Sequence, residues 1–338
     1  MSLRILRPGL LTTVQDLGRF GYQKDGIIVS GAMDATALRV ANLLVGNEDD
    51  AAGLEITLRG PTVRFEADHL VAFTGAHLSP TLNGQPVGTN RSVWVRAGTE
   101  LGFGAATAGC RAYLAVAGGL AVPRVLGSRA TYLRAGLGGL HGRALRAGDQ
   151  LPVGAAPTRS ERLRQTLPAS PPGQPWAQAR YTPGPALCPT PRPNPVVRAV
   201  RGPEYAQFAA ASRRTFWQEP FAITPAADRM GYRLHGPPLA RRTRAELLSS
   251  AVAFGTVQVP ANGQAIVLLA DHQTTGGYPR LAQVITADFS ALAQAAPGQV
   301  LRFAEVTLAE AQALYLAQEQ RLRALRRAVA LQTARHAE

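Results

Sequence analysis

Residues 62–116 read TVRFEADHLVAFTGAHLSPTLNGQPVGTNRSVWVRAGTELGFGAATAGCRAYLAV. Apolar and β-branched runs alternate here with glycine, proline and asparagine, a pattern typical of short strands joined by turns. The Asn83-Gly84 pair lies between apolar residues and predicts a hairpin over 81–87. Five strands are predicted, at 62–65, 69–73, 92–95, 100–103 and 111–116. Their regular spacing favours a mainly β barrel or sandwich over a parallel α/β sheet.

Glycine and proline are frequent along the whole chain of 338 residues, which contains 34 glycines and 25 prolines. Ten of the prolines lie between Pro168 and Pro195, and such a segment can form neither a helix nor a central strand. It divides the chain into two lobes. We predict a first lobe at 1–155, a proline-rich connector at 156–195, a second lobe at 196–305 and a C-terminal helix at 306–338.

Three helices are predicted from their boundary residues. Asp34 can cap a helix that runs to Val45. A second, short helix is predicted at 204–217. In the tail, Thr307 and Glu310 form a capping box that opens a long helix rich in alanine and leucine. The second lobe is predicted to contain strands at 232–234, 256–259, 265–269 and 283–285.

Composition excludes several classes of site. Lys24 is the only lysine, so the chain has no G-x-x-x-x-G-K-[ST] phosphate loop and no suitable lysine for covalent biotin. Cys110 and Cys188 form no C-x-x-C pair and the histidines are scattered, so no metal site is expected. The net charge of +14 comes from dispersed arginines without an aromatic RNA-binding motif, which argues against nucleic-acid binding. No apolar run is long enough for a signal peptide or a membrane span, so we expect a cytoplasmic protein.

Polar residues embedded in glycine form candidate functional clusters. The first cluster contains Gln15, Asp16 and Arg19, and the second contains Ser30, Asp34, Arg39 and Asn42. The exposed amides at the start of the 34–45 helix would suit an anion. Simple capping is the favoured explanation for Asp34, and a structural salt bridge explains Arg39 and Asn42 as well as anion binding does.

The third cluster follows the predicted strand at 265–269 and has the most polar groups. Its members are Asp271, Gln273, Thr274, Thr275, Gly276, Gly277 and Tyr278, and Gln258 is a further substrate-binding candidate. Hydroxyls, an amide and glycines that admit a ligand close to the backbone are more typical of a binding site than of a turn alone. We expect Asp228 and Arg229, the fourth cluster, to converge on this loop. Arg129 and Tyr132 add another candidate contact for an anion.

Six longer motifs resemble one protein family. They are TVQDLGRFGYQ (13–23), SGAMD (30–34), ANLLVGN (41–47), YLAVAGGL (113–120), VLGSR (125–129) and QTTGGYP (273–279). Together they resemble the biotin-dependent carboxyltransferase family, also called allophanate hydrolase subunit 2, over about residues 3–306. That family includes the C-type subunit of bacterial 5-oxoprolinase, the Kip-type antagonist proteins and the carboxyltransferase part of urea carboxylase.

The resemblance implies two cyclophilin-like β-barrel lobes and a multi-subunit enzyme. Its leading implication is the C-type subunit of an ATP-dependent 5-oxoprolinase, which opens 5-oxo-L-proline to L-glutamate with ATP and water. A subunit-B partner similar to Kip inhibitors and a separate A-type protein would complete the complex, with ATP used at the level of the complex. We then expect Asp228, Arg229 and Gln273 to be catalytic and the other candidates to bind a small anionic substrate.

Two alternatives stay open. The chain could be a carboxyltransferase subunit that uses biotin carried by another chain, or a non-catalytic Kip-type regulator. The sequence also departs from the family pattern at two places. Ala226 and Ala227 stand where a serine pair is frequent, and Ser250 stands where an acidic residue commonly follows Ser249. No family role is therefore carried over to these positions.

Overall fold

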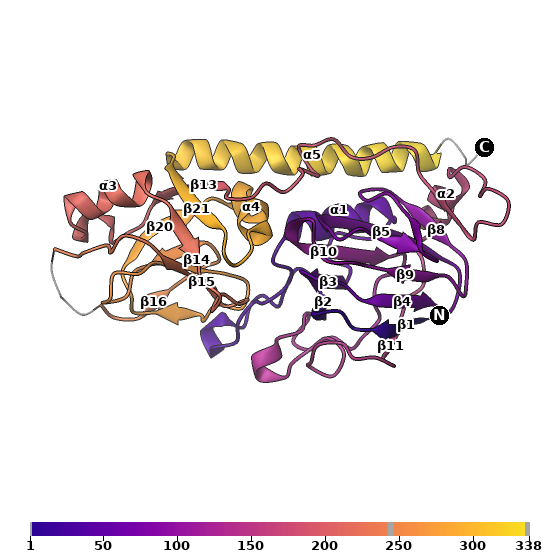
Figure 1. Cartoon of the computed structure of the whole chain (residues 1–338), viewed down its shortest axis with the longest axis horizontal. Coiled ribbons are helices and arrows are strands. Elements are labelled where there is room, and N and C mark those ends of the chain that lie inside the picture. The colour runs from indigo at the N-terminus through magenta and orange to yellow at the C-terminus, as the bar shows by residue number, and fades with distance from the viewer. Residues whose placement is uncertain (1, 243–246, 335–338) are drawn as a thin grey trace. The chain divides into compact units, whose positions relative to one another are not determined.

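The computed structural model describes residues 2–242 and 247–334 (Figure 1). Contacts group the described residues into two compact units. The first unit comprises 2–18, 34–191 and 319–334, and the second comprises 19–33 and 192–318. The division of the chain into four consecutive segments stays a prediction, and its last four residues, 335–338, lie outside the described part.

Two six-stranded antiparallel sheets build the first unit. In spatial order, one contains β11 (Gln150–Pro152), β1 (Ser2–Arg7), β4 (Thr62–Phe65), β9 (Glu100–Gly102), β6 (Thr81–Leu82) and β7 (Gln85–Pro86). The other contains β12 (Trp176–Gln178), β8 (Val93–Val95), β5 (His69–His77), β10 (Ala108–Val116), β3 (Gly53–Thr57) and β2 (Leu11–Gln15). One core lies between them, because alternate residues such as Ile5 and Phe65 of one sheet and Phe73 and Leu114 of the other point into it.

The second of these sheets is also buried on its outer face. Leu70 and Ala72 of β5 point outward, and they pack with residues of α1 (Ala35–Leu44), α2 (Thr158–Gln165) and α5 (Leu308–Ala334). We call this set the outer apolar cluster. With both faces covered, β5 and β10 are buried along nearly their whole length instead of at alternate residues.

A closed seven-stranded barrel forms the second unit. Its order is β13 (Val196–Arg201), β20 (Arg280–Val284), β17 (Thr256–Gln258), β18 (Ile266–Leu268), β15 (Gly231–His235), β14 (Phe221–Ile223) and β21 (Val300–Glu305). β13 and β21 run parallel, and the other neighbours are antiparallel. The barrel is filled by large side chains, including Phe216 and Phe303, whose ring centroids are 4.5 Å apart. A separate two-stranded sheet joins β16 (Ser250–Ala251) to β19 (Thr275–Gly276).

The remaining described elements are short. They are α3 (Ala210–Gln218), α4 (Phe289–Gln294) and the 3₁₀ turns η1 (Gln23–Asp25), η2 (Leu133–Ala135), η3 (Tyr205–Gln207) and η4 (Thr286–Asp288). In the described residues, no helix is long and apolar enough to cross a bilayer.

The mainly β class, with few helices and a long C-terminal one, is confirmed. Strands form at all nine predicted places, within a few residues of the predicted ends. Asn83 and Gly84 both have positive φ, as a two-residue hairpin turn requires. Asp34 accepts a hydrogen bond from the Ala37 amide, and Thr307 and Glu310 make the predicted capping box. Local sequence patterns were sufficient to predict these strands, the 83–84 turn and the two helix caps.

One prediction about a helix is wrong. A helix was expected throughout 204–217, but Phe208 and Ala209 are extended and α3 begins only at Ala210. Phe208 is fully buried in the barrel core and the Ala209 amide donates to the Ala240 carbonyl oxygen, so tertiary contacts override helix propensity there. α2 was not predicted; it lies at 158–165, before the proline-rich run that begins at Pro168, and places Leu163 in the outer apolar cluster.

Packing of α5 onto the outer apolar cluster gives the first testable prediction. Leu322 is 2% exposed and Leu316 is 58% exposed on the same helix. We expect Leu322→Ala to lower the free energy of unfolding by about 2–5 kcal/mol, because it leaves a cavity in a packed core. Leu316→Ala is the matched control and should change it by about 0.5 kcal/mol or less. Equal effects in denaturant titrations would contradict this packing.

Candidate functional site

A buried ion pair links two of the predicted clusters within the second unit. The Arg229 guanidinium donates to both carboxylate oxygens of Asp271, through Nε at 2.9 Å and Nη2 at 3.0 Å. Both residues are buried, and the Asp271 amide also donates to the Arg229 carbonyl oxygen. Charges out of water need such complete hydrogen bonding to offset their lost hydration. Arg229 therefore contacts Asp271, the residue that immediately precedes the polar loop.

The same pair fixes the segment that contains Ser30. The Ser30 hydroxyl donates to Asp271 at 2.7 Å, and Arg229 Nη2 donates to the Gly31 carbonyl oxygen at 2.6 Å. Ser30 and Gly31 have φ values of 55° and 88°, and two successive residues in this left-handed region are uncommon. The Ser30 hydroxyl, the Gly31 carbonyl oxygen and the two charged side chains of the ion pair thus hold one another in place. Arg19, also buried, donates its amide to the Val29 carbonyl oxygen and closes the same segment.

Beyond Asp271 the chain forms an exposed polar loop over 272–278. The Gln258 side chain lies beneath it, buried, and donates to the Tyr278 carbonyl oxygen at 3.4 Å. A Cβ at Gly276 would lie 2.6 Å from the Gln258 amide nitrogen and 3.3 Å from that of Gln273, so a larger residue would displace these amides. The side-chain amides of Gln258 and Gln273 therefore lie close to each other beside Gly276 of β19.

The remaining loop residues present neutral groups to solvent. Thr275, Gly277 and Tyr278 are exposed, and Tyr278 is 52% accessible. The Thr274 carbonyl oxygen accepts from the Val252 amide. Burial lowers the pKa of His272, so its imidazole is neutral at pH 7 and contacts the Gln273 carbonyl oxygen. This loop offers hydrogen bonds without a fixed charge.

One of the positions that depart from the family pattern, Ser250, is close to this loop. Ser250 pairs with Gly276 and Ala251 pairs with Thr275 in the two-stranded sheet. Asp228 serves a turn, because its Oδ1 accepts from the amides of Met230 and Gly231. Its predicted catalytic role stays a prediction.

In the first unit, Asp16 is the centre of another contact network. Its carboxylate accepts from the Gly18 amide, the Ser128 hydroxyl and the Arg129 amide, at 2.8, 2.7 and 2.5 Å. The Arg129 side chain donates to the Val122 carbonyl oxygen, and Tyr132 precedes η2 with its amide bonded to the Leu137 carbonyl oxygen. These contacts order the 122–137 loop.

Gln15 and Asp34 each make buried polar contacts within the first unit. Gln15 is fully buried and donates to Thr13 and to the Thr131 carbonyl oxygen. The Asp34 amide donates to the Tyr113 hydroxyl at 2.7 Å, which in turn donates to Glu55 at 2.7 Å.

Tyr113 and Glu55 were missed as candidates, although both are buried on neighbouring strands. Burial, reinforced by the Glu55 carboxylate, raises the pKa of Tyr113 well above its ordinary range, so the phenol keeps its proton. Their signal was present in the sequence: Tyr113 and Glu55 are polar side chains inside otherwise apolar strands.

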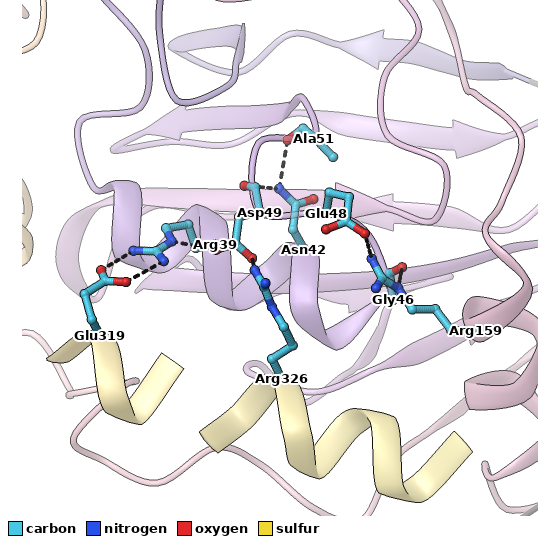
Figure 2. A network of polar contacts seen from close by, with 9 residues as sticks. All are labelled: Arg39, Asn42, Gly46, Glu48, Asp49, Ala51, Arg159, Glu319 and Arg326. Atoms are coloured by element: carbon cyan, nitrogen blue, oxygen red, sulfur yellow. Dashed lines mark hydrogen bonds and ion pairs between the residues drawn. The ribbon is translucent and has the colours of Figure 1, made fainter. Parts of the chain in front are cut away.

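Arg39 and Asn42 belong to a network between α1, the following loop and α5 (Figure 2). Arg39 donates to both carboxylate oxygens of Glu319 at 2.5 and 2.9 Å and to Asp49 at 3.0 Å. The hydrogen bond from Arg39 lowers the pKa of Glu319 and raises that of Arg39. Asn42 donates to the carbonyl oxygens of Asp49 and Ala51. These contacts favour the structural explanation, and a substrate-binding role for either residue stays a prediction.

In Figure 2 the same network continues toward α2. Arg326 of α5 pairs with Asp49 at 2.5 Å, and Arg159 of α2 pairs with Glu48 and donates to the Gly46 carbonyl oxygen. Across residues 2–242 and 247–334, no group of three or more His, Cys, Asp or Glu side chains could hold a metal ion.

Comparison with known protein families identifies the family of this chain. The model of the carboxyltransferase domain, subdomains A and B, matches residues 25–305. The chain belongs to this family. It is 45% identical over 312 residues to the C-type subunit of Escherichia coli 5-oxoprolinase, covering 91% of this chain and 93% of that one. The protein of the same name in Haemophilus influenzae is 40% identical, over 94% and 95% of the two chains.

Larger proteins contain a related part. Urea amidolyase of Saccharomyces cerevisiae is 30% identical over 96% of this chain, which spans only 18% of that protein. The crystal structure of Kluyveromyces lactis urea amidolyase superposes with a TM-score of 0.85 at 28% identity, over 96% of this chain and 20% of that chain. The recognised family is thus confirmed.

The buried ion pair gives a second prediction. Asp271→Asn leaves the Arg229 guanidinium buried without its carboxylate, so we expect a loss of about 3–5 kcal/mol in the free energy of unfolding. Asp25→Asn, an exposed aspartate of the same unit, is the control and should change it by about 0.5 kcal/mol or less. A loss below about 1 kcal/mol for Asp271→Asn would mean that the pair is solvated and weak.

Proposed function

We propose that this chain is the C-type subunit of an ATP-dependent 5-oxoprolinase complex, which converts 5-oxo-L-proline, ATP and water to L-glutamate, ADP and phosphate. One observation carries the proposal: the C-type subunits of two bacterial 5-oxoprolinases match nearly end to end, at 45% and 40% identity. The urea amidolyases match equally much of this chain but are several times longer. Identity to the urea amidolyases is only 30%, so the chain fits the first group better.

The polar loop over 272–278 is the proposed substrate-contacting element. Its amide and hydroxyl groups can bind the lactam and carboxylate of 5-oxoproline by neutral hydrogen bonds, and its glycines admit the ring close to the backbone. Gln273 is the proposed catalytic contact. Arg229 is proposed to act mainly by positioning, since its guanidinium is bonded to Asp271 and Gly31 at the base of the loop.

Partner proteins and ATP are part of the same proposal. The described residues include no phosphate-binding loop of the lysine type, because Lys24 lies in η1 and follows no glycine-rich turn. We propose that ATP is used at the level of the complex, with a B-type protein similar to Kip inhibitors and a separate A-type protein. We also propose that this chain and its partners are located in the cytoplasm.

A second candidate is a carboxyltransferase subunit that uses biotin carried by another chain. The superposition on Kluyveromyces lactis urea carboxylase, at a TM-score of 0.85 over 96% of this chain, favours it. The two candidates differ in their substrates, so a direct assay separates them.

Reconstitution gives the third prediction. We expect the purified chain alone to hydrolyse no 5-oxoproline, and the complex with the A-type and B-type proteins of the same genome to release glutamate when ATP is present. Gln273→Ala should lower this turnover about a hundredfold or more, the scale of one lost stabilising contact. Its melting temperature should stay within a few degrees, because Gln273 is partly exposed.

Gln85→Ala, in the exposed β7 of the first unit, is the control and should keep full turnover. Full turnover by the isolated chain would refute the requirement for partners. Full turnover with Gln273→Ala would remove this loop from the reaction. Carboxyl transfer from biotin in place of glutamate release would select the second candidate.

The fourth prediction concerns covalent biotin. Lys24 is the only lysine and lies in a turn unlike a biotin-acceptor hairpin, so no biotin should attach. Intact mass spectrometry after coexpression with a biotin ligase should show the unmodified mass. A biotin-sized increment that disappears in Lys24→Arg would overturn this expectation.

A further inference from the structure

A groove in the first unit lies apart from the polar clusters described above. It lies between the C-terminal half of α5 and the proline-rich segment 181–187 and has a volume of about 430 Å³. Tyr181, Leu187 and Leu325 line it and also pack on the outer apolar cluster. The adjacent Leu331 is 66% exposed, an unusual position for a large apolar side chain. The groove therefore has an apolar floor and an apolar rim.

The charged residue that lines the groove is Arg321. From Gln320 to Ala334, α5 carries three further arginines and no acidic residue, and Arg326 among them is paired with Asp49. The facing segment 181–187 carries no charge. An occupant with apolar side chains and acidic groups would match both properties.

A protein segment is the occupant that the comparisons favour. The relatives that match this chain nearly end to end are named as subunits of an enzyme, so a partner protein is expected. Its backbone and acidic side chains can meet the polar lining residues Gln332 and Arg321.

We propose that this groove binds an acidic segment of a partner protein, which inserts apolar side chains over Leu325 and places a carboxylate beside Arg321. The proposal rests on the proposed function only in that the partner is taken to be a member of the 5-oxoprolinase complex. The groove and its lining charge are independent of the reaction.

The test uses matched substitutions on α5. Ala328 lines the groove, while the exposed Ala330 is two residues on and faces away from it, since successive helical residues rotate by about 100°. Ala328→Trp fills the groove and Ala330→Trp is its control. Arg321→Glu reverses the lining charge, and Arg323→Glu reverses an exposed charge that does not line the groove.

Calorimetric titration of the full chain with the purified A-type and B-type proteins gives the affinities. We expect Ala328→Trp and Arg321→Glu to weaken binding of one partner about tenfold or more, and both controls to stay within about twofold. Equal affinities for all four variants would overturn the proposal, as would absence of binding to either partner. Competition by oleate, or a homodimer lost in Ala328→Trp, would assign the groove to a lipid or a second copy instead.

Turnover of 5-oxoproline by the wild-type complex separates this proposal from the proposed function. If the groove variants lose the partner but the wild-type complex releases no glutamate, the docking surface stands and the function fails. If glutamate is released and the groove variants assemble normally, the function stands and the docking surface fails.

Discussion

The ion pair between Arg229 and Asp271 is the interaction on which the arrangement of the second unit's polar loops depends. Three donors reach the Asp271 carboxylate, and the guanidinium also reaches the Gly31 carbonyl oxygen. Each buried charge loses several kcal/mol of hydration, which such complete bonding offsets only in part. The pair therefore acts more to position these segments than to stabilise the fold. It joins the left-handed Ser30–Gly31 turn to the start of the 272–278 loop.

The fixed contacts divide the predicted site residues into two kinds. Asp16, Arg39 and Asn42 have their polar groups bonded inside the first unit, where they order loops and join α1 to α5. Around 272–278, by contrast, exposed hydroxyl and amide groups remain available to a ligand. This difference, and not the polarity of the residues alone, supports assigning substrate contact to the loop.

Local signals in the sequence were enough for the strands, the 83–84 turn and the caps at Asp34 and Thr307, because each depends on near neighbours in the chain. They failed at Phe208, whose burial in the barrel breaks the expected helix, and they did not reveal α2. The pairing of Ser30 with Asp271 joins residues 241 positions apart, which no spacing rule could reveal. The family motifs identified both segments, but only the fold showed that they touch.

Replacement of the whole pair tests most directly whether it positions the loop. Arg229→Met combined with Asp271→Leu removes both charges together, and such apolar replacement is often neutral or stabilising. Melting temperature and 5-oxoproline turnover of the assembled complex are then measured on this one double variant. We expect a melting temperature within a few degrees of the wild type and turnover lowered about a hundredfold. Normal turnover in the folded double variant would contradict the account.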